Sequence, residues 1–452
     1  MKLASDGITN TEVIQALCLI ALKHVKTEQP ARAWMAIGTA SQLYALRSLF
    51  HGANPSASED QSNSRVYWSV FLLERLFVPL APAFSRTGEP CPPESAPLPP
   101  PVTSSTRDAI EAHRSATPGE RPTKDIGING YRLQLASIWG KIRFYLHRLR
   151  QGEVEKPWLS ESTHTKLSIE LMEYESRLSR RHLLDSVEFT KRTAEEVSRQ
   201  LEYWHPWLAT EILWHGAHAV LNHPFLHLVV LRSPEGIHQS FGFLQQKVDL
   251  ALYHACWVFR LIQTSQDLLE TADPLIGDVV AAVATVPWLF QFSKDAKVSQ
   301  RAREDLERCE AFLSTMALTW PHVSRKLIIL RKLRTLAEEN RRETTSHDAT
   351  ISFKPTWFWD LLDPKIHQST HSGSPELDLV SGSSNDPDAK MCLKKHFVLP
   401  LPEDQDPSGE QQALQSTNST EPFFMSPENF EQFHIDELSR DFLQDGFWGQ
   451  DY

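Results

Sequence analysis

Apolar residues recur at helical spacing from the first positions of the chain. Between residues 13 and 25 they fall three or four positions apart, which places one apolar stripe on one face of a helix. Thr9 stands three residues before Glu12, the spacing of a capping box, so we expect this helix to begin near Asn10. The stripe consists of Ile14, Leu17, Cys18, Ala21, Leu22 and Val25.

Two further helices are predicted directly after the first. Pro30 suits the first turn of a helix over residues 31–50, because the N–H that proline lacks would have no partner there. A third apolar stripe predicts a helix at 66–76. The short connection between the first two helices favours an antiparallel hairpin.

Later parts of the sequence also show the helical period, and no strand-like alternation of comparable length. The predicted segments are 131–149, 161–179, 184–202, 207–231, 239–269, 275–292 and 299–340, the last broken at Pro321. We therefore predict an all-α fold.

Composition divides the chain into a domain, an insert, a linker and a tail. Residues 1–342 are predicted to form one multi-helix domain, interrupted at 85–124 by a proline-rich insert that we expect to be disordered. Residues 343–400 are predicted to be a mostly disordered linker. Its tryptophan-rich segment 353–364 is the exception, and we expect it to pack on the domain. Residues 401–452 form an acidic tail rich in aromatic residues.

Short motifs in the first three predicted helices and in one later helix carry a family resemblance. The early motifs are Q-A-L, P-x-R-A-W-x-x-x-G-x-A and W-x-x-F-x-L-E-R, formed by Gln15, Ala16, Leu17, Ala33, Trp34, Gly38, Ala40, Trp68, Phe71, Leu73, Glu74 and Arg75. The later motif, at 218–232, is leucine-rich and contains His223 and Pro224. Over residues 1–342 the chain resembles the middle homology region of fungal Zn2Cys6-type transcription factors. It departs from that pattern at Glu74, where the family has aspartate, and after the third helix, where prolines replace the usual motif.

The resemblance implies a helical regulatory domain in a nuclear protein that controls a metabolic or secondary-metabolite gene set. It also implies an N-terminal zinc cluster, yet only twelve residues precede Val13. No C-x-x-C unit occurs, since the two nearest cysteines, Cys256 and Cys309, are 53 residues apart. We therefore expect a partner protein, or an N-terminal module missing from this sequence, such as unrecognised upstream exons, to supply DNA targeting.

Charge is unevenly distributed along the chain. Residues 401–452 contain twelve acidic residues and one basic residue, Arg440, which leaves 45 of each sign in residues 1–400. A body without net charge is poorly suited to neutralise DNA phosphates. We do not expect this chain to bind DNA directly.

The acidic tail has the composition of a transcription-activation segment. Acidic residues keep large apolar side chains in solvent, and those side chains can enter a groove on a coactivator as a short helix forms. The alternative is a last helix that packs back onto the domain. The candidate contact residues are Phe430, Phe433, Ile435, Leu438 and Phe442.

Four histidines of one predicted helix raise the question of a metal site. His215 and His218 share a helix face, but no carboxylate or thiolate stands at a matched spacing. His223 precedes Pro224, where the helix geometry is expected to change. We interpret these histidines and His227 as structural side chains with satisfied hydrogen bonds, and we predict no metal and no cofactor.

Enzyme motifs are missing from the sequence. It has no phosphate-binding loop, dinucleotide fingerprint, zinc-protease motif or serine-hydrolase elbow, and no aspartate cluster typical of a Mg²⁺-dependent cyclase. We predict no catalytic residue, and an all-α enzyme is the most remote alternative.

The leading hypothesis is a transcriptional regulator, and the alternative is a coregulator of the same fold that does not bind DNA. The predicted partner is a coactivator or a DNA-binding transcription factor, and a homodimer or heterodimer is left open. No segment has the 18 to 20 apolar residues, roughly, that a membrane helix needs.

Overall fold

The computed structural model describes residues 7–50, 57–77, 125–231, 241–271, 273–292, 296–343, 350–363 and 391–394. These residues form helices almost throughout, which confirms the all-α prediction. The proline-rich insert at 85–124 and the acidic tail at 401–452 lie outside the described residues.

Three N-terminal helices form a small unit with its own core: α2 (Thr11–Lys26), α3 (Pro30–Phe50) and α4 (Ala57–Phe77). The predicted stripe of α2 faces inward, and Ile14, Leu17 and Ala21 are at most 1% exposed. The core of this unit contains Ile14, Leu17, Cys18, Ala21, Ala36, Ile37, Ala40, Leu43, Val66, Val70 and Leu73. The apolar face of α2 is therefore covered by α3 and α4.

The capping box predicted for the first helix does not form. Asn10 is the N-cap residue of α2, and its side chain makes no capping hydrogen bond. The carbonyl of Thr9 instead accepts a hydrogen bond from Arg47 Nη1 of α3, at 3.0 Å. Pro30 does begin the second helix, as predicted.

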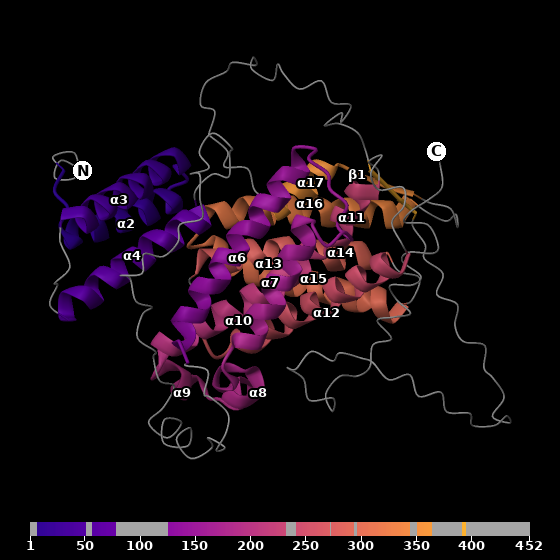
Figure 1. The fold of residues 1–452 in the computed structure, drawn as a ribbon. Coiled ribbons are helices and arrows are strands. Elements are labelled where there is room, and N and C mark those ends of the chain that lie inside the picture. The colour runs from indigo at the N-terminus through magenta and orange to yellow at the C-terminus, as the bar shows by residue number, and fades with distance from the viewer. Residues whose placement is uncertain are drawn as a thin grey trace.

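The N-terminal unit lies against one side of a larger helical body (Figure 1). Arg143 of α6 (Gly127–Arg150) donates from Nη1 to the carbonyl of Leu76, at 2.8 Å. An ion pair of 2.6 Å joins Glu28, just after α2, to Arg325 of the body. Polar contacts after α2 and at the end of α4 thus join the unit to the body.

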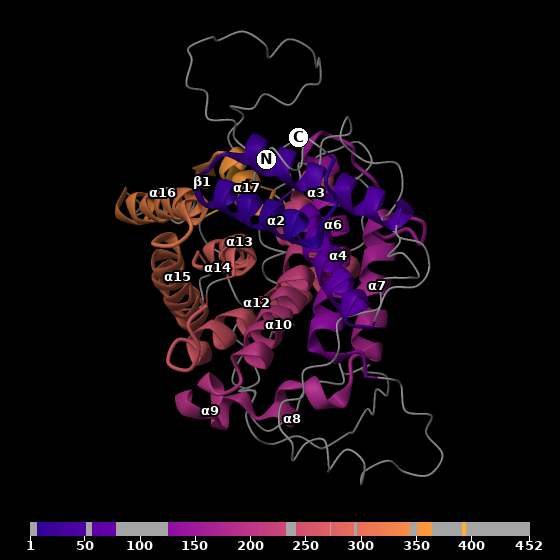
Figure 2. The same ribbon diagram turned by 90° about the vertical axis from the view of Figure 1, so that its left-hand side faces the viewer.

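The body contains the remaining helices. They are α7 (Thr163–Arg177), α8 (Leu184–Val187), α9 (Ala194–Ser198), α10 (Leu201–Leu221), α11 (Pro224–Leu231), α12 (Phe241–Ser265), α13 (Pro274–Val283), α14 (Thr285–Phe290), α15 (Ala296–Ala317) and α16 (Pro321–Glu343). Helices α6 and α7 lie on one side, and α15 and α16 on the other, with α10, α12 and α13 between them (Figure 2).

Helix α10 is the centre of the body. Of its 21 residues, 18 are buried, so it has no solvent-exposed face. It packs against α6, α7, α12 and α13. The approach to α13 is close, because a Cβ at Gly216 would lie 2.1 Å from Cγ1 of Val279.

Three predicted helices are broken in the structure, and one of them, 275–292, divides at Ala284 into α13 and α14. The segment 184–202 divides into short turns, since Glu188 adopts a left-handed conformation with φ of 50°. A capping box between Thr193 and Glu196 then starts α9. The segment 207–231 begins earlier than predicted and divides into α10 and α11 in front of Pro224.

The tryptophan-rich segment packs on the body, as expected. It forms α17 (Pro355–Leu362), in which Phe358 and Leu361 are fully buried. Residues Thr350–Phe353 (β1) pair antiparallel with Met391–Lys394 (β2), with Phe353 opposite Met391. These are the only strands within the described ranges, and the sequence did not predict them.

Candidate functional site

The early family-motif residues divide between surface and core. Gln15 and Ala16 are exposed on α2, whereas Leu17 is 1% exposed. Trp34 and Gly38 are half-buried on α3. A Cβ at Gly38 would meet nothing within 4 Å, so packing does not require glycine at this position.

The third-helix motif faces the junction between the N-terminal unit and α6. Trp68 is buried, while Glu74 and Arg75 are half-buried. The Arg75 guanidinium lies 5.3 Å from the ring centroid of Phe71, and a Cβ at Gly140 of α6 would lie 3.1 Å from Arg75 Cδ. These motif residues therefore have a structural role in joining the unit to the body.

The buried pair His223 and Pro224 marks the break between α10 and α11. Nδ1 of His223 accepts from the Phe225 N–H at 3.1 Å, so Nε2 carries the proton and donates to Thr285 Oγ1 at 2.8 Å. Burial lowers the pKa of His223 to about 3, which keeps the ring neutral. The structural interpretation of His223 fits this geometry.

The other three histidines belong to a buried polar strip, which we call the histidine seam. It consists of His164 of α7, His215 and His218 of α10, His227 of α11, and Lys247 and His254 of α12. Each of these side chains is at most 8% exposed. The seam is the largest gathering of buried titratable groups that we find in the described part of the chain.

One end of the seam lies between α10 and α12. Nδ1 of His215 and Nδ1 of His254 are 2.9 Å apart, and the rings of His218 and His254 stack with centroids 4.2 Å apart. Trp257 stacks on His215. Burial lowers the pKa of His215 and His254 well below the usual value and that of His218 to about 3, so all three are neutral at pH 7.

The other end of the seam contains its only cation. Lys247 Nζ lies 5.1 Å from the ring centroid of Phe243, and that ring makes edge contacts with His164 and His227. Burial lowers the pKa of Lys247 to about 8. Glu155, beside His164, is occupied in capping α7, because its Oε1 and Oε2 accept from His164 N–H and Thr163 Oγ1, both at 3.0 Å.

The prediction of satisfied hydrogen bonds is wrong for His218 and His227. Nε2 of His218 and both ring nitrogens of His227 are buried and have no hydrogen-bond partner within the described residues. A buried polar atom without a partner costs roughly 1–3 kcal/mol. With Nε2 of His164 the seam holds four such atoms among the described residues, and they call for an explanation.

A second candidate surface lies between α16 and α17. It is a shallow groove of about 400 Å³ lined by Ile328, Arg331, Lys332, Thr335, Leu336, Glu339 and Trp357. The side chain of Ile328 is 49% exposed. The groove combines apolar surface with two cationic side chains and one carboxylate, that of Glu339.

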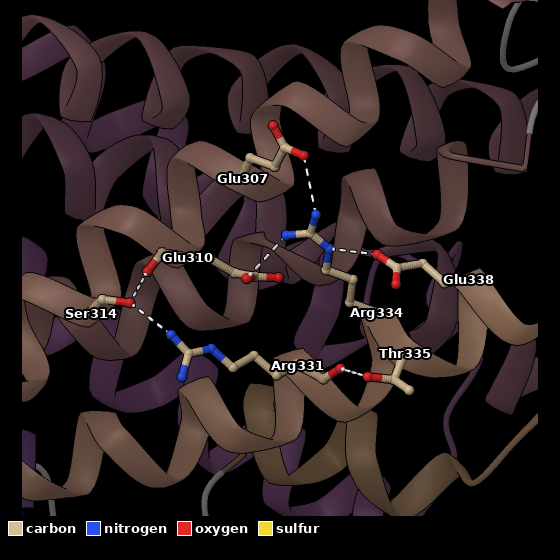
Figure 3. Close-up of polar contacts among 7 residues, drawn as sticks. All are labelled: Glu307, Glu310, Ser314, Arg331, Arg334, Thr335 and Glu338. Atoms are coloured by element: carbon tan, nitrogen blue, oxygen red, sulfur yellow. Dashed lines mark hydrogen bonds and ion pairs between the residues drawn. The ribbon is translucent and has the colours of Figure 1, made fainter.

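The groove borders a polar contact between α15 and α16 (Figure 3). Arg334 lies among Glu307, Glu310 and Glu338, at 3.2, 3.3 and 3.0 Å. Arg331 donates to Ser314 Oγ at 3.1 Å. These contacts fix the two helices relative to each other. The positive charge of Arg334 is balanced by the carboxylates around it.

The five tail residues proposed for activation, Phe430, Phe433, Ile435, Leu438 and Phe442, lie outside the described residues. Within the described part of the chain, no group of three or more histidine, cysteine, aspartate or glutamate side chains is arranged to hold a metal ion. None of the helices described is long and apolar enough to cross a membrane.

Sequence reasoning missed His164, Lys247 and His254. Lys247 and His254 are seven residues apart, which places them on one face of a helix, and this spacing is the signal that was available. Comparison with known proteins adds no name to the site: no family model, curated protein or solved structure matches this chain.

Proposed function

We propose that the chain regulates transcription of a metabolic gene set in the nucleus and acts through proteins rather than by binding DNA itself. DNA targeting would come from a partner or from an N-terminal module outside this sequence. The observation that carries the proposal is the charge asymmetry: a body without net charge precedes 52 residues with a net charge of −11. The motif resemblance over residues 1–342 supports the same function.

In this proposal the helical body is the regulatory part and the tail the activating part. Aromatic residues alternate with acidic residues in 423–452, as in segments that fold into a coactivator groove. The groove on α16 supplies the body with a surface for a protein partner, since Ile328, Arg331 and Trp357 line it together.

A reporter assay tests the activation role. Residues 423–452 fused to an unrelated DNA-binding domain should switch on a reporter gene, and the Phe430→Ala, Phe433→Ala double variant should reduce the signal several-fold. The matched control is Gln432→Ala, which leaves the aromatic residues in place. An inactive fusion that accumulates normally would refute the activation role.

One observation, the α16 groove, favours the coregulator alternative. A protein partner could bind this groove without any DNA contact or activating tail. Ile328→Asp would place a carboxylate in the apolar part of the groove. If the body recruits a DNA-binding partner, this variant should release the partner while Ile169→Asp, at another exposed isoleucine, should not. Specific operator binding by the isolated chain at physiological salt would contradict both candidates.

A further inference from the structure

Lys247 is a buried cation without an anionic partner in the part of the chain that the structure describes. Its side chain is 8% exposed, and no carboxylate of the described residues forms an ion pair with it. Lysine is almost never fully buried unless it is paired, because removal of its charge from water is costly. The aromatic ring of Phe243 provides weak compensation only, at 5.1 Å.

Ring contacts place histidines of three other helices near this cation. The Phe243 ring beside Lys247 Nζ makes edge contacts with His164 of α7 and His227 of α11, and His218 of α10 stacks on His254, seven residues after Lys247. After burial, the charge of Lys247 is a further cause of the lowered pKa of His164, His218 and His227. Burial is the largest cause of each lowered pKa, and the rings are therefore neutral at pH 7. A neutral imidazole keeps one N–H donor.

The unsatisfied atoms have the polarity that an anion needs. Both ring nitrogens of His227 and Nε2 of His218 lack a partner among the described residues, and each ring can direct an N–H toward a ligand by its choice of tautomer. A metal cation is disfavoured, since Lys247 would repel it and the rings do not form a metal-binding group.

We propose that Lys247, His218 and His227 form a binding site for a small molecule with a carboxylate group. The single cation matches a single negative charge, whereas phosphate dianions are usually held by arginine or by several cations. The rest of the ligand would lie beside the apolar edge formed by Phe243 and the half-buried Trp158, whose rings contact each other with centroids 6.3 Å apart. The site does not depend on the transcriptional proposal, since it is tested by binding alone.

Acetate and benzoate are the probes, titrated against the full-length protein at pH 7 and at constant ionic strength maintained with chloride. Ligand that binds only the folded state raises the melting temperature with its concentration. Wild-type protein should be stabilised by both probes. In Lys247→Met the apparent affinity should fall about tenfold or more, because a hydrogen-bonded charge is lost. Lys332→Met, at an exposed lysine of the groove, should respond like wild type.

Imidazole NMR of the wild-type protein provides a measurement that needs no variant. Benzoate should shift the ring signals of His218 and His227, whereas His223, with both nitrogens already bonded, should not move. Equal stabilisation of wild type and Lys247→Met, or no response of the two seam histidines, would overturn the site. A stronger response to inorganic phosphate than to acetate would overturn the carboxylate assignment.

Discussion

Two lysines of this protein are buried to a similar degree, and only one is paired. Lys326 of α16 is 4% exposed and lies 3.0 Å from the carboxylate of Asp278 on α13. Lys247 of α12 is 8% exposed and faces neutral histidines. The first lysine completes a contact between two helices, whereas the second brings an uncompensated charge into the body.

The two lysines differ in what surrounds the buried charge, and this difference appears in the pKa values of the groups involved. The charge of Lys326 and that of His322 keep the pKa of Asp278 below its usual value, even though burial alone would raise it. Around Lys247 the described residues place no carboxylate in an ion pair, and burial lowers its pKa. Unpaired groups of this kind gather at functional sites more often than in structural contacts.

Removal of the paired lysine should have the largest effect. Lys326→Met leaves the Asp278 carboxylate largely buried with only His322 beside it, and we expect the free energy of unfolding to fall by about 3 kcal/mol. Urea unfolding followed by circular dichroism measures this change. The double variant Lys326→Met, Asp278→Asn should recover much of the stability lost in Lys326→Met. If the losses of the two single variants simply add in the double variant, the two side chains are not coupled, which would contradict the pairing.

The unpaired lysine should make the stability of the protein depend on pH in alkaline solution. Its pKa is about 8 in the folded protein and 10.5 when unperturbed, so the folded state disfavours the charged form. Below pH 8 the folded state carries the full free-energy cost of the buried charge. As the pH rises from 8 to 10.5 this cost disappears, and the free energy of unfolding increases by at most about 3 kcal/mol.

The measurement is the difference in unfolding free energy between wild type and Lys247→Met at pH 7.5 and at pH 10, without added carboxylate. The comparison is necessary because burial raises the pKa of Cys18 to about 11, which lowers stability above pH 9 in both proteins. A pH-independent difference would show that Lys247 keeps its charge in solvent.

One substitution at two buried histidines should have opposite effects. His223→Leu removes the acceptor for the Phe225 N–H and should cost about 1–3 kcal/mol. His227→Leu removes two unpartnered nitrogens at similar volume and should be neutral or stabilising by about 1 kcal/mol. Chemical denaturation of both variants, at pH 7 in carboxylate-free buffer, decides the question. Equal losses would show that the nitrogens of His227 are satisfied, for example by water.

The smallest effect is expected on the α15–α16 surface. Arg334→Met removes a cation from among three carboxylates, yet its side chain is 38% exposed, so the loss should stay at or below about 1 kcal/mol. It should decrease further in 0.5 M salt. A larger, salt-independent loss would show that this network resembles the Lys326 contact rather than an exposed ion pair.

The periodicity of the sequence was sufficient to predict the position and the buried side of helices that have one polar face. The inward positions of α2 and the break at Pro321 followed from it, and both are confirmed. It was insufficient at 184–202, because the left-handed turn at Glu188 leaves no trace in an apolar pattern. Helix α10 was placed only approximately, since a helix buried on all sides has no periodicity from which to find its start.

The site was harder to predict than the fold. His164, His218 and Lys247 belong to three helices, and only the packing of α7, α10 and α12 brings them into one strip. The four histidines around α10 and α11 were recognisable, but their hydrogen bonds depend on distant residues such as Thr285 and His254. A sequence pattern shows which residues share a face and does not show what lies opposite.

The burial of α10 has a consequence for synthesis in the cell. This helix needs α12 and α13 to cover it, and α13 ends about 60 residues after Leu221. At roughly 5–20 residues per second, the ribosome takes on the order of 3 to 12 seconds to supply them. For that time the nascent chain carries an apolar helix with several tryptophans and no completed cover. A chain that stops between α10 and α13 would be a substrate for chaperones and proteases.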